Sequence, residues 1–281
     1  MNEKIEIGKY NILQIDRDSD HGLHLISQDE ETSVLLPNIY VSNDMQIGNE
    51  IKVFVYTDSE DRPIATTLTP KAVVGEFALL KVIDQNKIGA FLDWGLAKDL
   101  FVPLNQQKRG MLKVGKKFIF RVALDKESNR VYASQKVGQF LDNDTKYLKI
   151  NDKVNLLVLA KTPLGFKVIV NNRHEGMLFN NEIFEDLFTG NRRKGYIKKI
   201  RDDGKLDISL QPIGKQSIDL AEDKIITLLD ENGGILPYNY KTEPEIIKKV
   251  FGLSKKAYKR VLTQLIDKKI IIIEDSNIKK L

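Results

Sequence analysis

The sequence predicts a mainly β protein that ends in a smaller α+β module. Two observations lead to this fold class. Four landmarks recur in register in three consecutive segments, and the hydrophobic period becomes helical from Ser217 onward. The length of 281 residues allows two to four compact units. We therefore expect three tandem β-barrels, in residues 1–69, 70–137 and 146–213, and an α+β domain in residues 215–281.

The repeat is marked by turn residues and apolar triplets. In each segment a turn residue is followed fourteen positions later by a glycine; these pairs are Gly8 and Gly22, Gly75 and Gly89, and Asn151 and Gly165. An apolar triplet then ends at Pro37, Pro103 or Phe179, and a second turn glycine follows at Gly48, Gly115 or Gly190. Four landmarks in register across three segments indicate three copies of one unit.

Each unit is a run of about 65–70 residues of short, alternating strands, as residues 116–124 illustrate. Five such strands in so small a unit are expected to close into a barrel, because an open sheet would leave long unpaired edges. The OB-fold is the five-stranded barrel of this size, and it binds nucleic acids or sugars. We therefore predict three tandem OB-folds, joined between the second and third by the polar segment 138–149.

Composition and charge restrict the classes of function. The chain has no cysteine, which excludes disulfides and thiolate metal sites and fits a reducing cytoplasm. We expect neither a signal peptide nor a membrane span, because the first residues lack the pattern of a leader and no apolar run approaches ~18 residues. Residues 1–69 carry a net charge of −8, whereas residues 70–145, 146–214 and 215–281 carry +5, +5 and +3. A polyanion would be repelled by the first segment and attracted by the others.

In an OB-fold the nucleic acid crosses the middle strands, where aromatic side chains stack on bases and cations follow the phosphates. Alternation favours the surface for Phe91 and the interior for Phe101, with the opposite orientation left open for each. The candidate binding residues of the second barrel are Lys87, Phe91, Trp94, Phe101, Lys126 and Arg130.

The other two barrels differ at the same register. The third barrel has Lys167 at the position of Phe91. Its densest basic run surrounds Tyr196, and basic residues around an aromatic ring suit the binding of a single strand. The alternative is that this run is a solvated turn. The candidates of the third barrel are Lys167, Phe179, Arg192, Arg193, Lys194, Tyr196 and Lys198. The first barrel has His24 at this position and an acidic surface, so we expect a spacer or a protein-contact surface there.

The C-terminal segment has the pattern of three helices and a hairpin. Asn232-Gly233-Gly234 ends the first helix, Thr242 is the expected N-cap of the second, and Ser254 is the expected N-cap of the third. A strand-like run at 270–274 follows, so the order is that of a winged helix. Its candidate nucleic-acid contacts are Lys255, Lys256, Lys259 and Arg260, with a protein-docking face as the alternative.

With this order of domains, the chain resembles the conserved virulence factor B family of bacteria. The stretches that carry the resemblance are 234–238, 244–256, 258–260 and 268–271, together with the Gly89-Ala90-Phe91 turn and the pair Asp125 and Arg130. The resemblance implies RNA-binding domains of the ribosomal protein S-one type, a C-terminal winged helix, and a post-transcriptional effect on gene expression. Pro103 stands where such repeats commonly have a histidine.

We therefore expect a cytoplasmic protein that binds single-stranded RNA by occupancy, without catalysis and without a cofactor. Two alternatives are a DNA-binding regulator led by the winged helix and a nuclease. A nuclease would need clustered carboxylates or a poised histidine, whereas His21, His24 and His174 are scattered along the chain.

Overall fold

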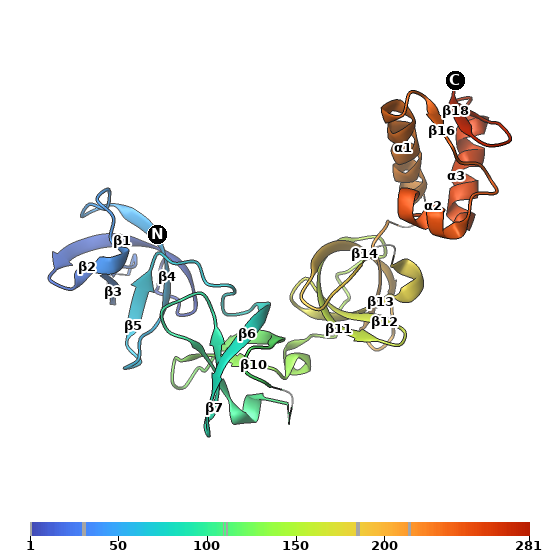
Figure 1. The fold of residues 1–281 in the computed structure, drawn as a ribbon. Helices are drawn as coiled ribbons and strands as arrows, with labels where there is room; N and C mark the ends of the chain where they lie inside the picture. The colour runs from blue at the N-terminus through green and yellow to red at the C-terminus, as the bar shows by residue number, and fades with distance from the viewer. Residues whose placement is uncertain (1, 30–31, 109, 111, 184–185, 213–214) are drawn as a thin grey trace. The chain divides into compact units, whose positions relative to one another are not determined.

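The structure, a computed structural model, describes the chain except residues 1, 30–31, 109, 111, 184–185 and 213–214. It divides into two compact units, Met1–Leu141 and Asp142–Leu281. The first unit holds two five-stranded β-barrels, and the second holds a third barrel and the helical C-terminal module (Figure 1). The predicted fold class is therefore confirmed. No helix of the described residues combines the length and the apolar character needed to cross a bilayer.

The three barrels share one order of strands. The first comprises β1 (Lys9–Ser19), β2 (Gly22–Ile26), β3 (Ser33–Pro37), β4 (Glu50–Thr57) and β5 (Pro63–Thr66). The second comprises β6 (Phe77–Gln85), β7 (Gly89–Asp93), β8 (Leu100–Pro103), β9 (Lys117–Leu124) and β10 (Val131–Ser134). The third comprises β11 (Lys153–Thr162), β12 (Gly165–Val170), β13 (His174–Phe179), β14 (Arg192–Ile200) and β15 (Leu206–Ser209).

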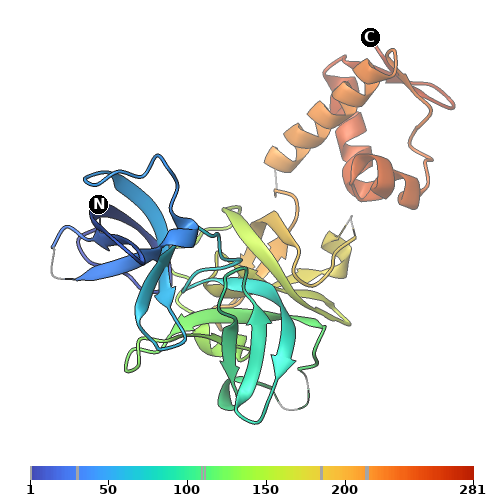
Figure 2. The same ribbon diagram turned by 60° about the vertical axis from the view of Figure 1, so that its left-hand side comes forward.

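The first and third barrels are closed, in the order β1-β2-β3-β5-β4 and its equivalent β11-β12-β13-β15-β14. The second has the corresponding order β10-β9-β6-β7-β8, without a ladder between β8 and β10. This is the partly open Greek-key barrel of the OB-fold. The strands of each barrel curve around an apolar interior, as the two views together show (Figure 2).

The repeated glycines are explained by a close approach of two strands. Gly22, Gly89 and Gly165 begin the second strand of their barrels and pair directly with the last residue of each apolar triplet. A Cβ atom at these glycines would lie 2.0, 2.3 and 2.1 Å from a backbone oxygen of the facing strand. Only glycine allows the backbones to approach so closely.

The first strand of each barrel also carries a β-bulge at the same place, between Ile15 and Arg17, Val82 and Asp84, and Val158 and Ala160. A bulge bends a strand and increases its twist, which lets one long strand pair with neighbours on both sides of a small barrel. The sequence repeat therefore preserves two features, a glycine and a bulge, that let the sheet curve in all three copies.

The C-terminal module comprises α1 (Lys215–Glu231), β16 (Ile235–Leu236), α2 (Pro244–Phe251), α3 (Lys255–Asp267), β17 (Ile271–Ile273) and β18 (Ile278–Lys280). Three helices and a three-stranded sheet form a winged helix around a buried core that includes Tyr258. Ser254 caps α3, since its hydroxyl accepts a hydrogen bond from the Ala257 N–H at 3.2 Å. The expected N-cap Thr242 is wrong by one residue: Glu243 is the N-cap of α2, and the Thr242 hydroxyl accepts from the Asn239 N–H instead.

The hydrophobic core of the second barrel extends to the first barrel, because it includes Phe54 and Tyr56 of β4. Trp94, which follows β7, is 3% exposed and packs edge-on against Phe54 and Tyr56 of β4, with ring centroids 5.5 and 6.4 Å away. Its indole N–H donates to the Ala72 carbonyl at 2.7 Å. Trp94 lines the groove described below, but its burial argues against the predicted role as a nucleic-acid contact, because the ring mainly holds the two barrels together.

Candidate nucleic-acid interface

An aromatic pair lies on the outer face of the second barrel. Phe91 on β7 and Phe101 on β8 are direct cross-strand partners, and their ring centroids are 5.3 Å apart at an interplanar angle of 44°. Both are half-buried, whereas their strand neighbours Leu92 and Val102 are fully buried, so the two phenylalanines point outward. The surface orientation of Phe91 is confirmed, and the interior orientation favoured for Phe101 is wrong.

The pair lies in a groove of about 870 Å³. One wall comes from the second barrel, with Lys98, Lys126 and Arg130 among its residues. The other wall comes from the first barrel, through the end of β4 and the loop that joins β4 to β5. The groove thus combines aromatic surface with three cations, which is the combination that binds single-stranded nucleic acid.

Arg130 is held at the groove by the hairpin between β9 and β10. The Asp125 carboxylate accepts hydrogen bonds from the N–H groups of Glu127 and Ser128, at 2.9 and 3.3 Å, and these bonds lower the pKa of Asp125. The Asp125 N–H in turn donates to the Arg130 carbonyl at 2.9 Å. Lys87 is exposed on the loop between β6 and β7 and does not line the groove, so the structure separates it from the other candidates of this barrel.

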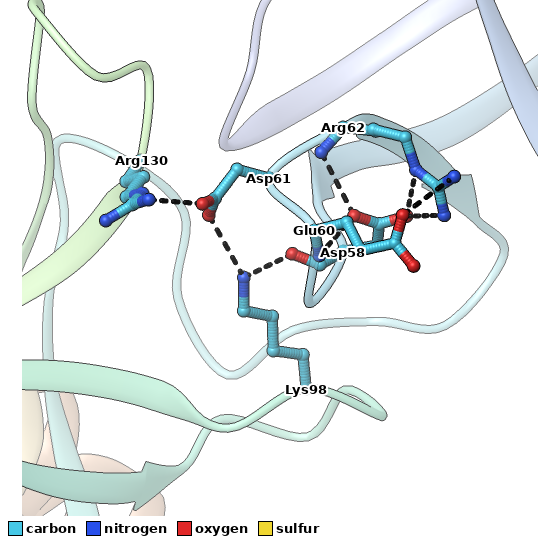
Figure 3. A network of polar contacts seen from close by, with 6 residues as sticks. All are labelled: Asp58, Glu60, Asp61, Arg62, Lys98 and Arg130. Atoms are coloured by element: carbon cyan, nitrogen blue, oxygen red, sulfur yellow. Dashed lines mark hydrogen bonds and ion pairs between the residues drawn. The ribbon is translucent and has the colours of Figure 1, made fainter.

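A carboxylate from the first barrel reaches the same cations. Asp61, in the loop between β4 and β5, forms an ion pair with Arg130 and lies 3.9 Å from the Lys98 Nζ (Figure 3). Lys98 also donates to the Asp58 carbonyl at 2.5 Å. Burial alone would raise the pKa of the Asp58 carboxyl, but hydrogen bonds from Arg62 and from the loop N–H groups outweigh it and lower that pKa. The loop is therefore charged and internally hydrogen-bonded where it faces the groove.

The third barrel replaces the aromatic pair with a charged surface. At the same register Lys167 faces Met177, and Lys167 lies 3.8 Å from the Glu175 carboxylate. Phe179 is half-buried, with the Arg201 guanidinium 5.8 Å from its ring centre. These positions have the expected outward orientation but do not form a stacking platform of two rings.

The basic run of the third barrel lines a separate groove of about 430 Å³. Arg192, Arg193 and Lys194, at the start of β14, line it together with Asn155 and the asparagine turn at 171–172. Tyr196 and Lys198 lie further along β14 and outside this groove, and Lys198 is paired with Glu182. The structure thus brings three of the predicted cations together and leaves Lys167 and Phe179 apart from them.

The basic residues of the winged helix fall on the first turns of α3. Lys256, Lys259 and Arg260 are exposed, Lys255 is half-buried, and the intervening Tyr258 is buried in the core. The helix is amphipathic: Tyr258 faces the core, and the three exposed cations lie on the solvent side, where a polyanion can reach them.

The groove residues that were not predicted from the sequence include Tyr56, Asp61 and Lys98. Lys98 lies in the loop that joins the two aromatic strands, and its position between them is a signal that could have identified it. Tyr56 is 5% exposed, and burial raises its pKa to about 12, so its hydroxyl remains protonated at neutral pH. Nothing within the repeat indicates Tyr56 or Asp61, because both reach the groove from the neighbouring barrel.

Comparison with known proteins identifies two domains. Residues 7–68 match the model of an S1 domain, and residues 223–279 match that of a CvfB-like winged helix domain. The S1 match falls on the first barrel, the one in which His24 replaces the aromatic residue. An S1 domain followed by a winged helix supports nucleic-acid binding.

Relatives of similar length extend the match over nearly the whole chain. The uncharacterized protein YitL of Bacillus subtilis is 27% identical over 92% of this chain and 88% of its own. Conserved virulence factor B of Staphylococcus saprophyticus is 26% identical over 89% of this chain and 85% of its own. A crystal structure from Streptococcus pneumoniae, described as a multidomain protein with nucleic acid binding domains, is 22% identical over 98% of both chains with a TM-score of 0.41. Over some 90% of its length the chain is thus similar to the conserved virulence factor B proteins, and its C-terminal domain matches the CvfB-like winged helix model.

Proposed function

We propose that this protein binds single-stranded RNA through its barrels, assisted by the winged helix, and regulates gene expression after transcription. It acts in the cytoplasm by occupying its RNA target, without catalysing a reaction. The observation that carries the proposal is the outward pair of Phe91 and Phe101 in a groove bordered by cations. Rings of this kind stack on bases only where the bases are unpaired.

The electrostatic features of the chain support the same proposal. Phosphate contacts supply affinity that depends on salt but not on sequence, and the groove at Arg192, Arg193 and Lys194 offers a second place for the backbone. The third barrel therefore has a cationic surface of its own for the RNA backbone. The S1 match of the first barrel supports nucleic-acid binding by this type of domain.

The alternative is a DNA-binding regulator led by the winged helix. The observation in its favour is the exposure of Lys256, Lys259 and Arg260 on α3, the helix that enters the major groove in winged-helix proteins that read DNA.

The deciding experiment measures the affinity of the full chain for a labelled single-stranded RNA, the same strand as DNA, a hairpin RNA and a duplex DNA, across a salt series. We expect the tightest binding to single-stranded RNA, with a slope of roughly −0.7 in log K against log salt for each phosphate contact. Tighter binding to duplex DNA would refute the proposal and assign the function to the winged helix. Equal binding to the RNA and DNA single strands would retain the groove and refute its preference for RNA.

A further inference from the structure

The groove of the second barrel already holds an anionic group, and it belongs to the chain itself. The Asp61 carboxylate pairs with Arg130 and lies 3.9 Å from the Lys98 Nζ. Figure 3 shows it reaching from the first barrel toward these two cations of the second. An RNA phosphate that approaches Arg130 and Lys98 meets cations whose charge is partly neutralised by this carboxylate.

The loop that carries Asp61 is built to hold it there. Asp58 accepts from the N–H groups of Glu60 and Arg62 at 2.9 and 3.0 Å, and from the Arg62 guanidinium at 2.9 and 2.8 Å. The Asp61 N–H donates to the Asp58 carbonyl at 3.1 Å. Asp61 has a φ of 65°, a left-handed conformation that aspartate, asparagine and glycine tolerate better than other residues.

Neutralising Arg130 and Lys98 affects different nucleic acids unequally. A duplex, whose bases are stacked and paired, can bind this groove only through its phosphates, so it depends on the free charge of the two cations. A single strand also stacks on Phe91 and Phe101, and that part of its affinity does not depend on charge. A carboxylate placed against the cations therefore weakens the binding of the duplex more than that of the single strand.

We infer that Asp61 is a specificity-determining residue, which makes the groove select unpaired RNA by weakening binding that relies on phosphate contacts alone. The inference rests on the proposed function. The first barrel thus contributes to the binding site of the second through one acidic side chain, although its own outer surface lacks the aromatic pair.

The test uses the full chain with Asp61→Asn, which keeps the size and the tolerance for positive φ but removes the charge. The matched control is Glu60→Gln in the same loop, because Glu60 pairs with Arg62, at 3.1 Å, and not with the groove cations. Both variants change the net charge equally, so long-range effects cancel in the comparison. Asp61→Gly, which also tolerates the backbone conformation, is the second variant, and thermal unfolding confirms that each variant folds.

We expect Asp61→Asn to raise the affinity for a duplex RNA about fivefold, the order expected for one unit charge ~4 Å away in a water-like dielectric. The affinity for single-stranded RNA should rise less, and Glu60→Gln should change either affinity less than twofold. Three results would overturn the inference: Asp61→Asn equal to Glu60→Gln, an equal gain for both ligands, or a loss of affinity. If the unsubstituted chain binds no RNA, the proposed function fails and this inference fails with it.

Discussion

Removal of the Phe91 ring tests the stacking platform most directly. Phe91→Ala leaves the backbone ladder between β7 and β8 in place but removes one of two rings whose centroids are 5.3 Å apart. Stacking of a base on an aromatic side chain contributes about 1–3 kcal/mol, so the affinity for single-stranded RNA should fall roughly 5- to 150-fold. The lost contact between the rings should lower the free energy of unfolding by about 0.5–1.5 kcal/mol, which the folded barrel should tolerate.

The assay is fluorescence anisotropy of a labelled single-stranded RNA, with thermal unfolding as the check on folding. The control is Phe188→Ala, which removes an aromatic ring that is 67% exposed in the second unit and lines neither groove. Combination of Phe91→Ala with Arg130→Gln should weaken binding further and reduce the salt slope. If the folded Phe91→Ala variant binds within twofold of the parent chain, the assignment of this groove as the base-binding surface is refuted.

Three further substitutions separate binding from stability. Trp94→Phe removes the hydrogen bond to the Ala72 carbonyl, so the free energy of unfolding, measured by thermal unfolding, should fall by about 1–3 kcal/mol. The folded variant should keep its affinity for RNA. A loss of RNA affinity without a loss of stability would show that Trp94 belongs to the binding surface. Ser254→Ala removes the cap of α3 and should cost about 1 kcal/mol, measured by thermal unfolding, and an unchanged midpoint would contradict that role. The third change replaces four α3 cations with alanine: Lys255, Lys256, Lys259 and Arg260. RNA binding should become weaker and less dependent on salt. Binding at full strength would show that the winged helix is a scaffold or a protein-docking module.

The fold was predictable because the sequence repeat records backbone constraints. Gly22, Gly89 and Gly165 face a strand too closely for a side chain, so each copy keeps its glycine and the register can be read from it. Alternation along β7 also contained the answer for Trp94, which has the same parity as the buried Leu92. A lone tryptophan beside basic residues suggested a binding role, and the periodicity was the better guide.

The contribution of the first barrel to the groove could not be predicted in this way. Asp61 and Arg130 are 69 positions apart and belong to different copies of the repeat. Alignment of the copies compares equivalent positions and carries no information on which loops meet when two barrels pack together. The strongly acidic first segment did predict repulsion of a polyanion, but not that one of its carboxylates would meet the cations of its neighbour.

The three barrels share one backbone fold but differ in the side chains on their outer surfaces. The same cross-strand position holds His24 and Leu35 in the first barrel, Phe91 and Phe101 in the second, and Lys167 and Met177 in the third; the second is the one copy with two aromatic rings there. Affinity from stacking should therefore reside in the second barrel, and affinity from phosphate contacts should depend more on the third. Because stacking is far less sensitive to salt than phosphate contact, the two contributions can be separated in one titration. At high salt the remaining affinity should depend on Phe91 and Phe101, whereas substitutions at Arg192–Lys194 should have their largest effect at low salt.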